Sequence, residues 1–312
     1  MASLKHQFLT CIDRNFSEKG SDKHSAKHSQ HSGKEETMSR VWSFAERKSL
    51  IDISSQLAIY CKEEFKIRQI KDISSNHIQK FLESKADTCN NTSLSNYVSR
   101  INKLEVLVNK TFSSADVSWR GEIVAPISSI NVESKLRNVF MTIEDYNKLI
   151  DYFKDKNTNA KYALELSGMF GLRASECEKL QLRDCDFHKM ELHIIGSKGG
   201  KNRDIPITPE NALRLKEIIQ ERGLINQTDR IVGIYAESID RRINEACKNL
   251  GLTQYCNGKS SIHSCRKLWA SSTYEKFMEQ GYSKKDALNK TSKLLGHGSN
   301  RHDIAQAYIK NL

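Results

Sequence analysis

The chain has 312 residues, and its 49 lysines and arginines outnumber its 38 aspartates and glutamates, which gives a formal net charge of +11. This length predicts two domains, and a hydrophobic content of 38% can fill a core in each of them. No apolar run approaches the roughly 20 residues of a membrane-spanning helix, which excludes a membrane span. The first residues lack the apolar stretch of a secretory signal, so we do not expect one. The basic excess favours a polyanionic partner, because lysines and arginines that neutralise phosphates release counterions.

The N-terminal part differs from the rest of the chain in composition. Residues 17–36 read SEKGSDKHSAKHSQHSGKEE, which is polar and of low complexity. Such a tract has too little apolar surface to offset the entropy of ordering it. We therefore expect residues 1–40 to form a flexible polar arm suited to contacts with a nucleic-acid backbone.

Three segments follow in which apolar side chains recur with the helical period of 3.6 residues, at 41–65, 72–82 and 90–112. They predict a small, all-helical, basic-faced domain over residues 41–112. Residues 113–135 lose the periodicity and contain Pro126, one of only three prolines, which is typical of a linker.

A second domain is expected over residues 136–312. Thr142 is placed to cap a helix that leads into residues 146–153, and the next long helix ends at Gly171. The helical pattern then gives way to a segment of a different kind.

Residues 181–207 are predicted to form short strands, with a Gly-Gly hairpin turn between Lys198 and Lys201. Further helices are expected over residues 209–223, 236–251, 263–281 and 283–296, with a last one ending in residues 306–312. The fold class is therefore mainly α with a small β-sheet, that is, α+β.

The eight cysteines are scattered and include no CxxC pair, which indicates free thiols in a reducing cytosol rather than a disulfide framework or a zinc ribbon. Cys185, His188 and His193 are close in sequence but have no fourth ligand at a usual spacing. We do not expect a metal site there.

Two charged residues lie three positions apart in the motif GLRASE, residues 171–176. Arg173 follows the glycine that ends a helix, and Glu176 faces the same side. Alone, this is a surface pair worth less than about 1 kcal/mol.

A basic hairpin follows, SKGGKNR, in which Lys198 can reach into a site and withdraw. The GxxxxGK[ST] spacing of a nucleotide-binding phosphate loop is absent.

His263 and Arg266 are one helical turn apart, so both side chains can point at one phosphate. Arginine binds a phosphate through its planar fork, and histidine donates a proton or a hydrogen bond. Leu-Gly-His follows, ending at His297, and Tyr308 comes eleven residues later on the predicted last helix. Taken singly, each of these residues is an ordinary surface or packing residue.

In this order, the pieces Arg…Lys…His-x-x-Arg…Leu-Gly-His…Tyr resemble the tyrosine recombinase family, the phage integrases. GLRASE is similar to the first arginine box of the family, and Lys198 falls where its hairpin lysine does. His263, Arg266 and His297 match the second box, and Tyr308 takes the position of the nucleophile. The resemblance covers the expected catalytic domain, and the helical domain before it looks like the family's SAM-like core-binding domain.

The resemblance implies an enzyme, a site-specific DNA recombinase (integrase) that cuts and rejoins double-stranded DNA through a 3′-phosphotyrosyl intermediate, for integration or excision of a mobile element. It implies no cofactor and no metal, because arginines supply the positive charge. It also implies a homotetramer on paired sites, a Holliday-junction intermediate, accessory proteins that bend DNA or set direction, and a cytoplasmic, nucleoid-associated location. The resemblance implies that Tyr308 is the nucleophile and that Arg173 and Arg266 stabilise the charge of the transition state. Lys198 would be the general acid, and His263 and His297 would donate hydrogen bonds or transfer protons. Glu176 would orient Arg173.

Two features depart from the family pattern. The intervals from Arg266 to His297 and from His297 to Tyr308 are longer than is common, and only four residues follow Tyr308. Because many relatives dock a longer tail onto a neighbouring subunit, we expect this chain to assemble differently.

Two alternatives stay open: a type IB topoisomerase that relaxes supercoils as a monomer, and a DNA-binding accessory protein with an inactive site. The complete set of site residues argues against the second, and the compact catalytic domain favours recombination over the first.

Overall fold

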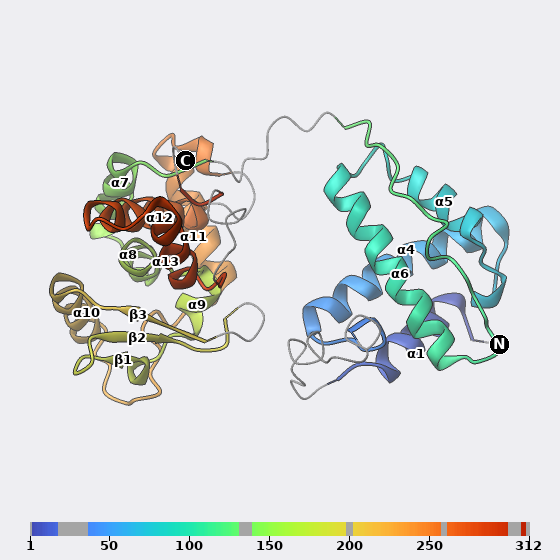
Figure 1. Ribbon diagram of the computed structural model, residues 1–312, viewed down its shortest axis with the longest axis horizontal. Helices are drawn as coiled ribbons and strands as arrows, with labels where there is room; N and C mark the ends of the chain where they lie inside the picture. The colour runs from blue at the N-terminus through green and yellow to red at the C-terminus, as the bar shows by residue number, and fades with distance from the viewer. Residues whose placement is uncertain are drawn as a thin grey trace. The chain divides into compact units, whose positions relative to one another are not determined.

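A computed structural model describes residues 2–17, 37–130, 139–197, 202–256, 261–298 and 307–309 of the chain. The chain divides into two compact units, residues 1–133 (unit 1) and residues 134–312 (unit 2), each with its own hydrophobic core (Figure 1). Within the described ranges, no helix has both the length and the apolar character needed to cross a membrane.

Unit 1 is a bundle of α-helices, in which α1 packs against α4 and α6, and α4 and α6 pack against each other (Figure 1). Each of these helices begins after a side chain that accepts a backbone N–H of the first turn, which supplies one of the acceptors that a helix N-terminus lacks. The elements are α1 (Leu4–Arg14), α4 (Phe44–Phe65), η1 (Ile70–Asp72), α5 (Ser75–Glu83) and α6 (Asn91–Thr111), and the caps of the α-helices are Ser3, Ser43, Ser74 and Asn90.

The N-terminal residues differ from the flexible arm expected over residues 1–40. Leu4, Phe8, Cys11 and Ile12 recur on one side of α1 and are buried in the core of unit 1. The expectation of an arm is therefore wrong for the helix α1, because these apolar side chains anchor it. The polar tract lies almost entirely at residues 18–36, outside the described residues.

The first part of the expected linker also belongs to unit 1. Val117, Trp119 and Ile123 are buried in the same core as the helices. The indole N–H of Trp119 donates to the carbonyl oxygen of Ile73 at 2.7 Å. These residues lose the helical period because they pack in an irregular conformation, and the boundary between the units falls later, after residue 133.

Unit 2 is built around α12 (Ser261–Glu279), which packs against α8, α11 and α13 (Figure 1). The first half of α12 is buried on several sides, and this is the stretch that contains Arg266. Thr142 caps α7 as predicted, since its hydroxyl accepts the N–H of Asp145 at 3.1 Å. The other elements are α7 (Ile143–Lys154), α8 (Ala160–Phe170), α9 (Ala174–Lys179), η3 (Leu182–Asp184), α10 (Pro209–Glu221), α11 (Ala236–Asn249), η4 (Thr253–Tyr255) and α13 (Lys284–Leu294).

A three-stranded antiparallel sheet of order β1-β2-β3 completes unit 2. Its strands are β1 (Cys185–Asp186), β2 (Glu191–Ile194) and β3 (Arg203–Pro206), all inside the segment predicted to form strands. Leu192 pairs with Ile205 and Ile194 with Arg203. Leu192, Ile194 and Ile205 are buried, so this face of the sheet lies against the core. The predicted Gly-Gly turn lies at residues 198–201, outside the described residues.

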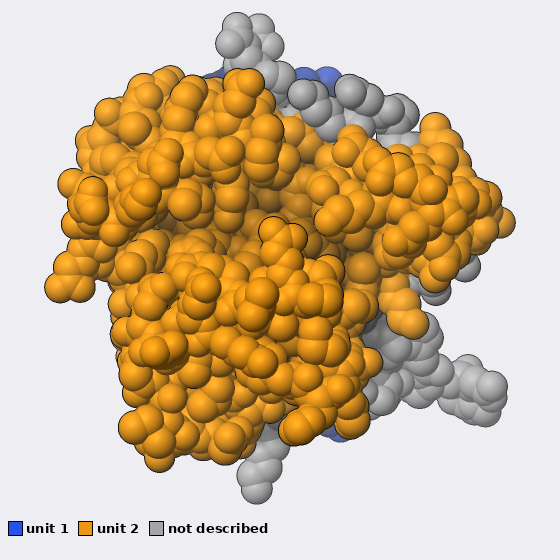
Figure 2. All heavy atoms as spheres, turned by 90° about the vertical axis from the view of Figure 1, so that its left-hand side faces the viewer, with its two compact units in different colours: residues 1–133 blue, residues 134–312 orange. Residues whose placement is uncertain are grey.

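The described chain is thus mostly helical with one small sheet, which confirms the predicted α+β class. The last predicted helix is wrong at residues 307–309, which form a turn and a bend, and the rest of that segment lies outside the described residues. Figure 2 shows one face of unit 2, with a hollow near its middle.

Candidate active site

Gly171 ends α8 in the left-handed conformation, at φ +63°, and thereby sets the place of Arg173. A Cβ on this residue would lie 2.2 Å from the ring of Trp269, so only glycine fits the turn. Arg173 then precedes α9, and its backbone N–H donates to Oε2 of Glu176 at 2.9 Å. Its guanidinium donates to Oε1 of the same carboxylate at 2.6 Å. The motif therefore brings the two side chains together as predicted.

This pair is not a surface pair, because Glu176 is buried among three arginines. Its side chain is 2% exposed, and Arg203 donates one hydrogen bond to each of its oxygens, both at 2.9 Å. Arg266 lies 3.6 Å away, and the hydroxyl of Ser197 donates at 2.5 Å. Burial alone would raise the pKa of Glu176, but the hydrogen bonds and charge of Arg203, followed by Arg266 and Arg173, hold that pKa well below its ordinary value. The carboxylate is therefore ionised.

Arg266 lies on the buried half of α12, and its side chain is fully buried. Its guanidinium donates to the carbonyl oxygen of Gly171 and, at 2.5 Å, to that of Leu295. Burial, and then the charge of Arg173, lower the pKa of Arg266 to about 9, so the group stays charged at neutral pH. Its Nε atom is buried and has no hydrogen-bond partner in the part of the chain that the structure describes.

Tyr308 lies within the same cluster. Its ring centroid is 5.1 Å from that of His263 and 5.2 Å from that of His297, and the guanidinium carbon of Arg266 lies 5.6 Å from it. Nε2 of His297 is 3.3 Å from a guanidinium nitrogen of Arg173. Tyr308 is 8% exposed, and it also belongs to a small apolar cluster with Ala270 and Leu295.

Six of the seven predicted site residues thus meet in unit 2: Arg173, Glu176, His263, Arg266, His297 and Tyr308. The seventh, Lys198, lies outside the described residues. Sequence reasoning missed Arg203 and Ser197, which flank the hairpin and both contact Glu176. Strand alternation was the available signal for Arg203, because residues two apart share a face and Ile205 is an obvious core residue.

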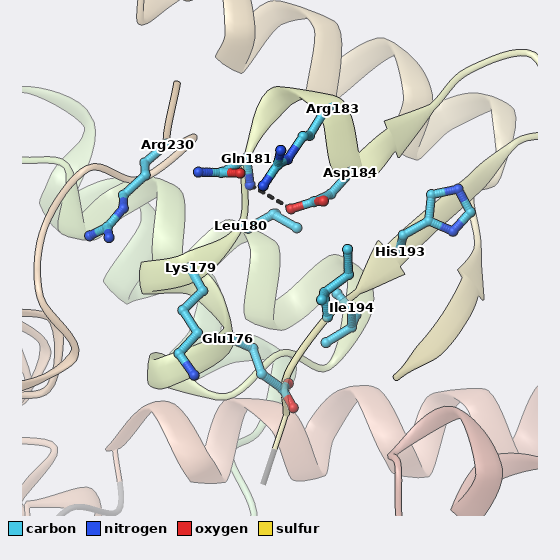
Figure 3. A pocket seen from close by; sticks show the side chains of 10 residues that line it. Glu176, Lys179, Leu180, Gln181, Arg183, Asp184, His193, Ile194 and Arg230 are labelled. Atoms are coloured by element: carbon cyan, nitrogen blue, oxygen red, sulfur yellow. Dashed lines mark hydrogen bonds between the residues drawn. The ribbon is translucent and has the colours of Figure 1, made fainter. Parts of the chain in front are cut away.

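A cavity of about 270 Å³ lies beside this cluster, with Glu176 in its wall (Figure 3). Its lining includes three exposed basic side chains, Lys179, Arg183 and Arg230, none of which belongs to the predicted set. Figure 3 shows Lys179 and Glu176 at one end and Gln181, Arg183 and Asp184 at the other. The cavity extends the basic character of the site beyond the clustered arginines.

The half-buried Glu191 and His193 of β2 also meet the exposed Asp204 of β3, with their ligand atoms within 4.8 Å of one another. Nδ1 of His193 is 2.7 Å from Oδ1 of Asp204, an ordinary interaction between residues paired across two strands. Such groups are common on protein surfaces without a bound ion.

Residues 139–311 match the sequence model of the phage integrase family. The chain belongs to this family. Over 106 residues it is 37% identical to the tyrosine recombinase XerA of Pyrococcus furiosus, a match that covers 34% of each protein. This integrase-family chain therefore aligns with only about a third of the length of that curated relative.

Solved structures share the fold of this integrase-family chain. The recombinase XerH bound to palindromic difH substrate matches with a TM-score of 0.63 and 14% identity, over 98% of this chain and 91% of that one. A lambda integrase fragment, a dimer bound to a COC′ core site, matches with a TM-score of 0.60 and 17% identity, over 88% and 91%. Family and fold therefore agree with the resemblance read from the motifs.

Proposed function

We propose that this chain is a site-specific DNA recombinase that cuts and rejoins double-stranded DNA through a phosphotyrosyl intermediate, in the integration or excision of a mobile element. One observation carries the proposal: the ring of Tyr308 packs against His263, His297 and the guanidinium of Arg266. A tyrosine beside three groups that can bind a phosphate or move a proton is the arrangement that nucleophilic cleavage of a phosphodiester requires.

The charge of the site supports an anionic substrate. Three guanidinium groups, those of Arg173, Arg203 and Arg266, contact one carboxylate, that of Glu176, which leaves an excess of two positive charges (three minus one) among the described residues. The Nε of Arg266 adds a buried donor that has no hydrogen-bond partner among the described residues. A phosphate placed here would be stabilised strongly, because the donors are already oriented and shielded from water.

The covalent step follows from this placement. The phenolic oxygen of Tyr308 attacks phosphorus as the bond from phosphorus to the 5′ oxygen breaks, which leaves a 3′-phosphotyrosyl ester and a free 5′ hydroxyl. Attack of a 5′ hydroxyl on that ester reverses the step and reseals the DNA, so no external energy source is consumed. His263 and His297 lie near the ring, and we assign to them the removal of the proton from the phenol of Tyr308. From sequence alone, we assign to Lys198 the protonation of the departing 5′ oxygen.

The partners follow from the same reaction. The XerH structure is bound to difH substrate, and the lambda integrase fragment is a dimer bound to a COC′ core site. By analogy we assign double-stranded DNA as the substrate of this chain, and from the family resemblance we assign a homotetramer on paired sites as its working assembly. Accessory DNA-bending or directionality proteins and a cytoplasmic location on the nucleoid belong to the same proposal.

The test is covalent trapping on nicked duplexes in EDTA, with Tyr308→Phe as the paired variant. A nick beside the cleaved position releases a short fragment and leaves the protein attached to DNA. We expect a slower band on a denaturing gel with the wild type and none with Tyr308→Phe, while DNA binding is kept. An adduct that survives in Tyr308→Phe would move the nucleophile elsewhere and refute the assignment.

The topoisomerase alternative is tested on a plasmid with two recovered cleavage sites. A recombinase exchanges the markers that flank the sites, whereas a topoisomerase only relaxes the plasmid. Relaxation without exchange of markers would replace the proposed function with the alternative.

A further inference from the structure

We propose that Arg203 is a positioning residue for DNA cleavage, which holds Glu176 and, through Glu176, sets the guanidinium of Arg173 against the scissile phosphate. This inference rests on the proposed function. It adds to the site a residue that the motifs did not indicate.

The first support is the geometry at Glu176. Arg203 opens β3, and its side chain is 7% exposed. Nη1 and Nη2 donate to different oxygens of Glu176, each at 2.9 Å, and such a two-point contact fixes the plane of the carboxylate as well as its position. The same two oxygens accept the side chain and the backbone N–H of Arg173, at 2.6 and 2.9 Å. The plane that Arg203 imposes therefore sets the direction of Arg173.

The second support is the contact with the segment that carries His297. Nε of Arg203 donates to the carbonyl oxygen of Leu294, the last residue of α13, at 2.6 Å. Two residues later Gly296 turns the chain at φ +76°, and a Cβ there would lie 3.1 Å from Nη1 of Arg203. One side chain thus connects β3, Glu176 of α9 and the turn that leads to His297.

The third support is how the donors of Arg203 are used. A guanidinium has five N–H groups. Four of the five donate to protein acceptors, two to Glu176, one to the carbonyl oxygen of Leu294 and one, at 3.4 Å, to the hydroxyl of Ser197. Arg203 is therefore placed to act through Glu176 rather than on DNA. Lysine at this position keeps the charge but cannot span two carboxylate oxygens.

The test compares Arg203→Lys with the wild type on a nicked duplex whose cleavage site has been recovered by sequencing trapped DNA from a random library. The rate of covalent adduct formation in a single turnover and the Kd for the same duplex are measured. We expect the rate to fall by about 100-fold with the Kd unchanged, because a displacement of about 1 Å at a reacting group can cost that much.

A neutral substrate separates positioning from general damage to the fold. A methylphosphonate at the cleaved position removes the charge of a non-bridging oxygen and with it the need for Arg173. We expect the ratio of methylphosphonate to phosphodiester cleavage to rise in Arg203→Lys, as in Arg173→Ala. The matched control is Arg214→Ala, which breaks an ion pair with Glu165 at 2.5 Å outside this network and leaves the ratio at the wild-type value.

The outcomes separate this inference from the proposed function. If Arg203→Lys cleaves at the wild-type rate, or loses activity on both substrates equally, the inference is overturned and the proposed function stands. If the wild type forms no adduct on any duplex of the library, the proposed function itself fails.

Discussion

Replacement of Glu176 by glutamine is expected to destabilise unit 2 strongly. The side chain is 2% exposed, and both of its oxygens accept hydrogen bonds from Arg203 and Arg173. Glutamine keeps the shape but turns one acceptor into an N–H donor that faces other donors. At least one guanidinium N–H then stays buried without an acceptor, and the arginines lose their shared counter-charge.

The magnitude follows from the burial of the partners that remain. Arg266 is fully buried and Arg203 is 7% exposed, and neither contacts another carboxylate in the described parts of the chain. Removal of one partner from a buried ion pair costs about 3–5 kcal/mol, because the other charge stays buried and uncompensated. We therefore expect the free energy of unfolding of unit 2 to fall by about that much, with unit 1 unaffected.

Fluorine NMR during a urea titration can follow the two units separately. The chain has three tryptophans, and Trp269 is the one in unit 2, while Trp42 and Trp119 report on unit 1. After 5-fluorotryptophan labelling, each resonance gives its own unfolding midpoint.

The matched control is Glu165→Gln. Glu165 is 14% exposed and pairs with Arg214, which is 32% exposed, so we expect a loss of about 1 kcal/mol or less. If Glu176→Gln lost no more than this control, the reasoning on buried charge would be refuted.

Three further predictions concern acid stability and the two cores. The pKa of Glu176 is held well below its ordinary value of 4.5, so its stabilising contribution is full above about pH 5 and declines progressively as the pH falls below 4.5. The difference in unfolding free energy between the wild type and Glu176→Gln should therefore narrow between about pH 5 and 3, and a constant difference would contradict this. Gly171→Ala should lower the Tm of unit 2 by at least about 5 °C in calorimetry, since the added Cβ would clash with the ring of Trp269 in a left-handed turn. An unchanged Tm would contradict the close approach of Gly171 to that ring. Trp119→Phe should destabilise unit 1 by about 1–3 kcal/mol, because it leaves the buried carbonyl oxygen of Ile73 without its hydrogen-bond donor. An equal shift in the urea midpoint reported by Trp269 would contradict the separation of the two hydrophobic cores.

Local motifs made much of the site predictable. Arg173 and Glu176 are three residues apart after a helix-ending glycine, and His263 and Arg266 are one turn apart, so secondary structure alone brings each pair together. Only the family resemblance joined these pairs to Tyr308, because no local rule relates residues so far apart in the chain. The structure brings all of these residues into one cluster.

Burial and long-range pairing could not be predicted in the same way. Arg266 reads as a surface residue of a helix, yet its side chain is fully buried and donates to carbonyl oxygens from two other segments. The helix α1 was not predicted for a different reason. Its four buried apolar residues precede a long polar tract, and the composition of residues 1–40 taken as a whole is polar. Phe44 fits the helical period of residues 41–65 but is 73% exposed, so the period predicts the helix without fixing the burial of each apolar side chain.

The charge balance of the cluster explains why a single carboxylate among three arginines suits this reaction. Glu176 holds the guanidinium groups of Arg173, Arg203 and Arg266 in place and cancels one of their three charges, so an excess of two remains in the cluster. A phosphodiester carries one negative charge, and in the proposed cleavage this charge concentrates on the non-bridging oxygens as phosphorus becomes five-coordinate. Guanidinium groups that are already held in position stabilise this transition state more than the ground state, and this difference in binding lowers the barrier. Without Glu176 the three guanidinium groups would repel one another and lose their positions, so the buried carboxylate serves the proposed cleavage as well as the fold.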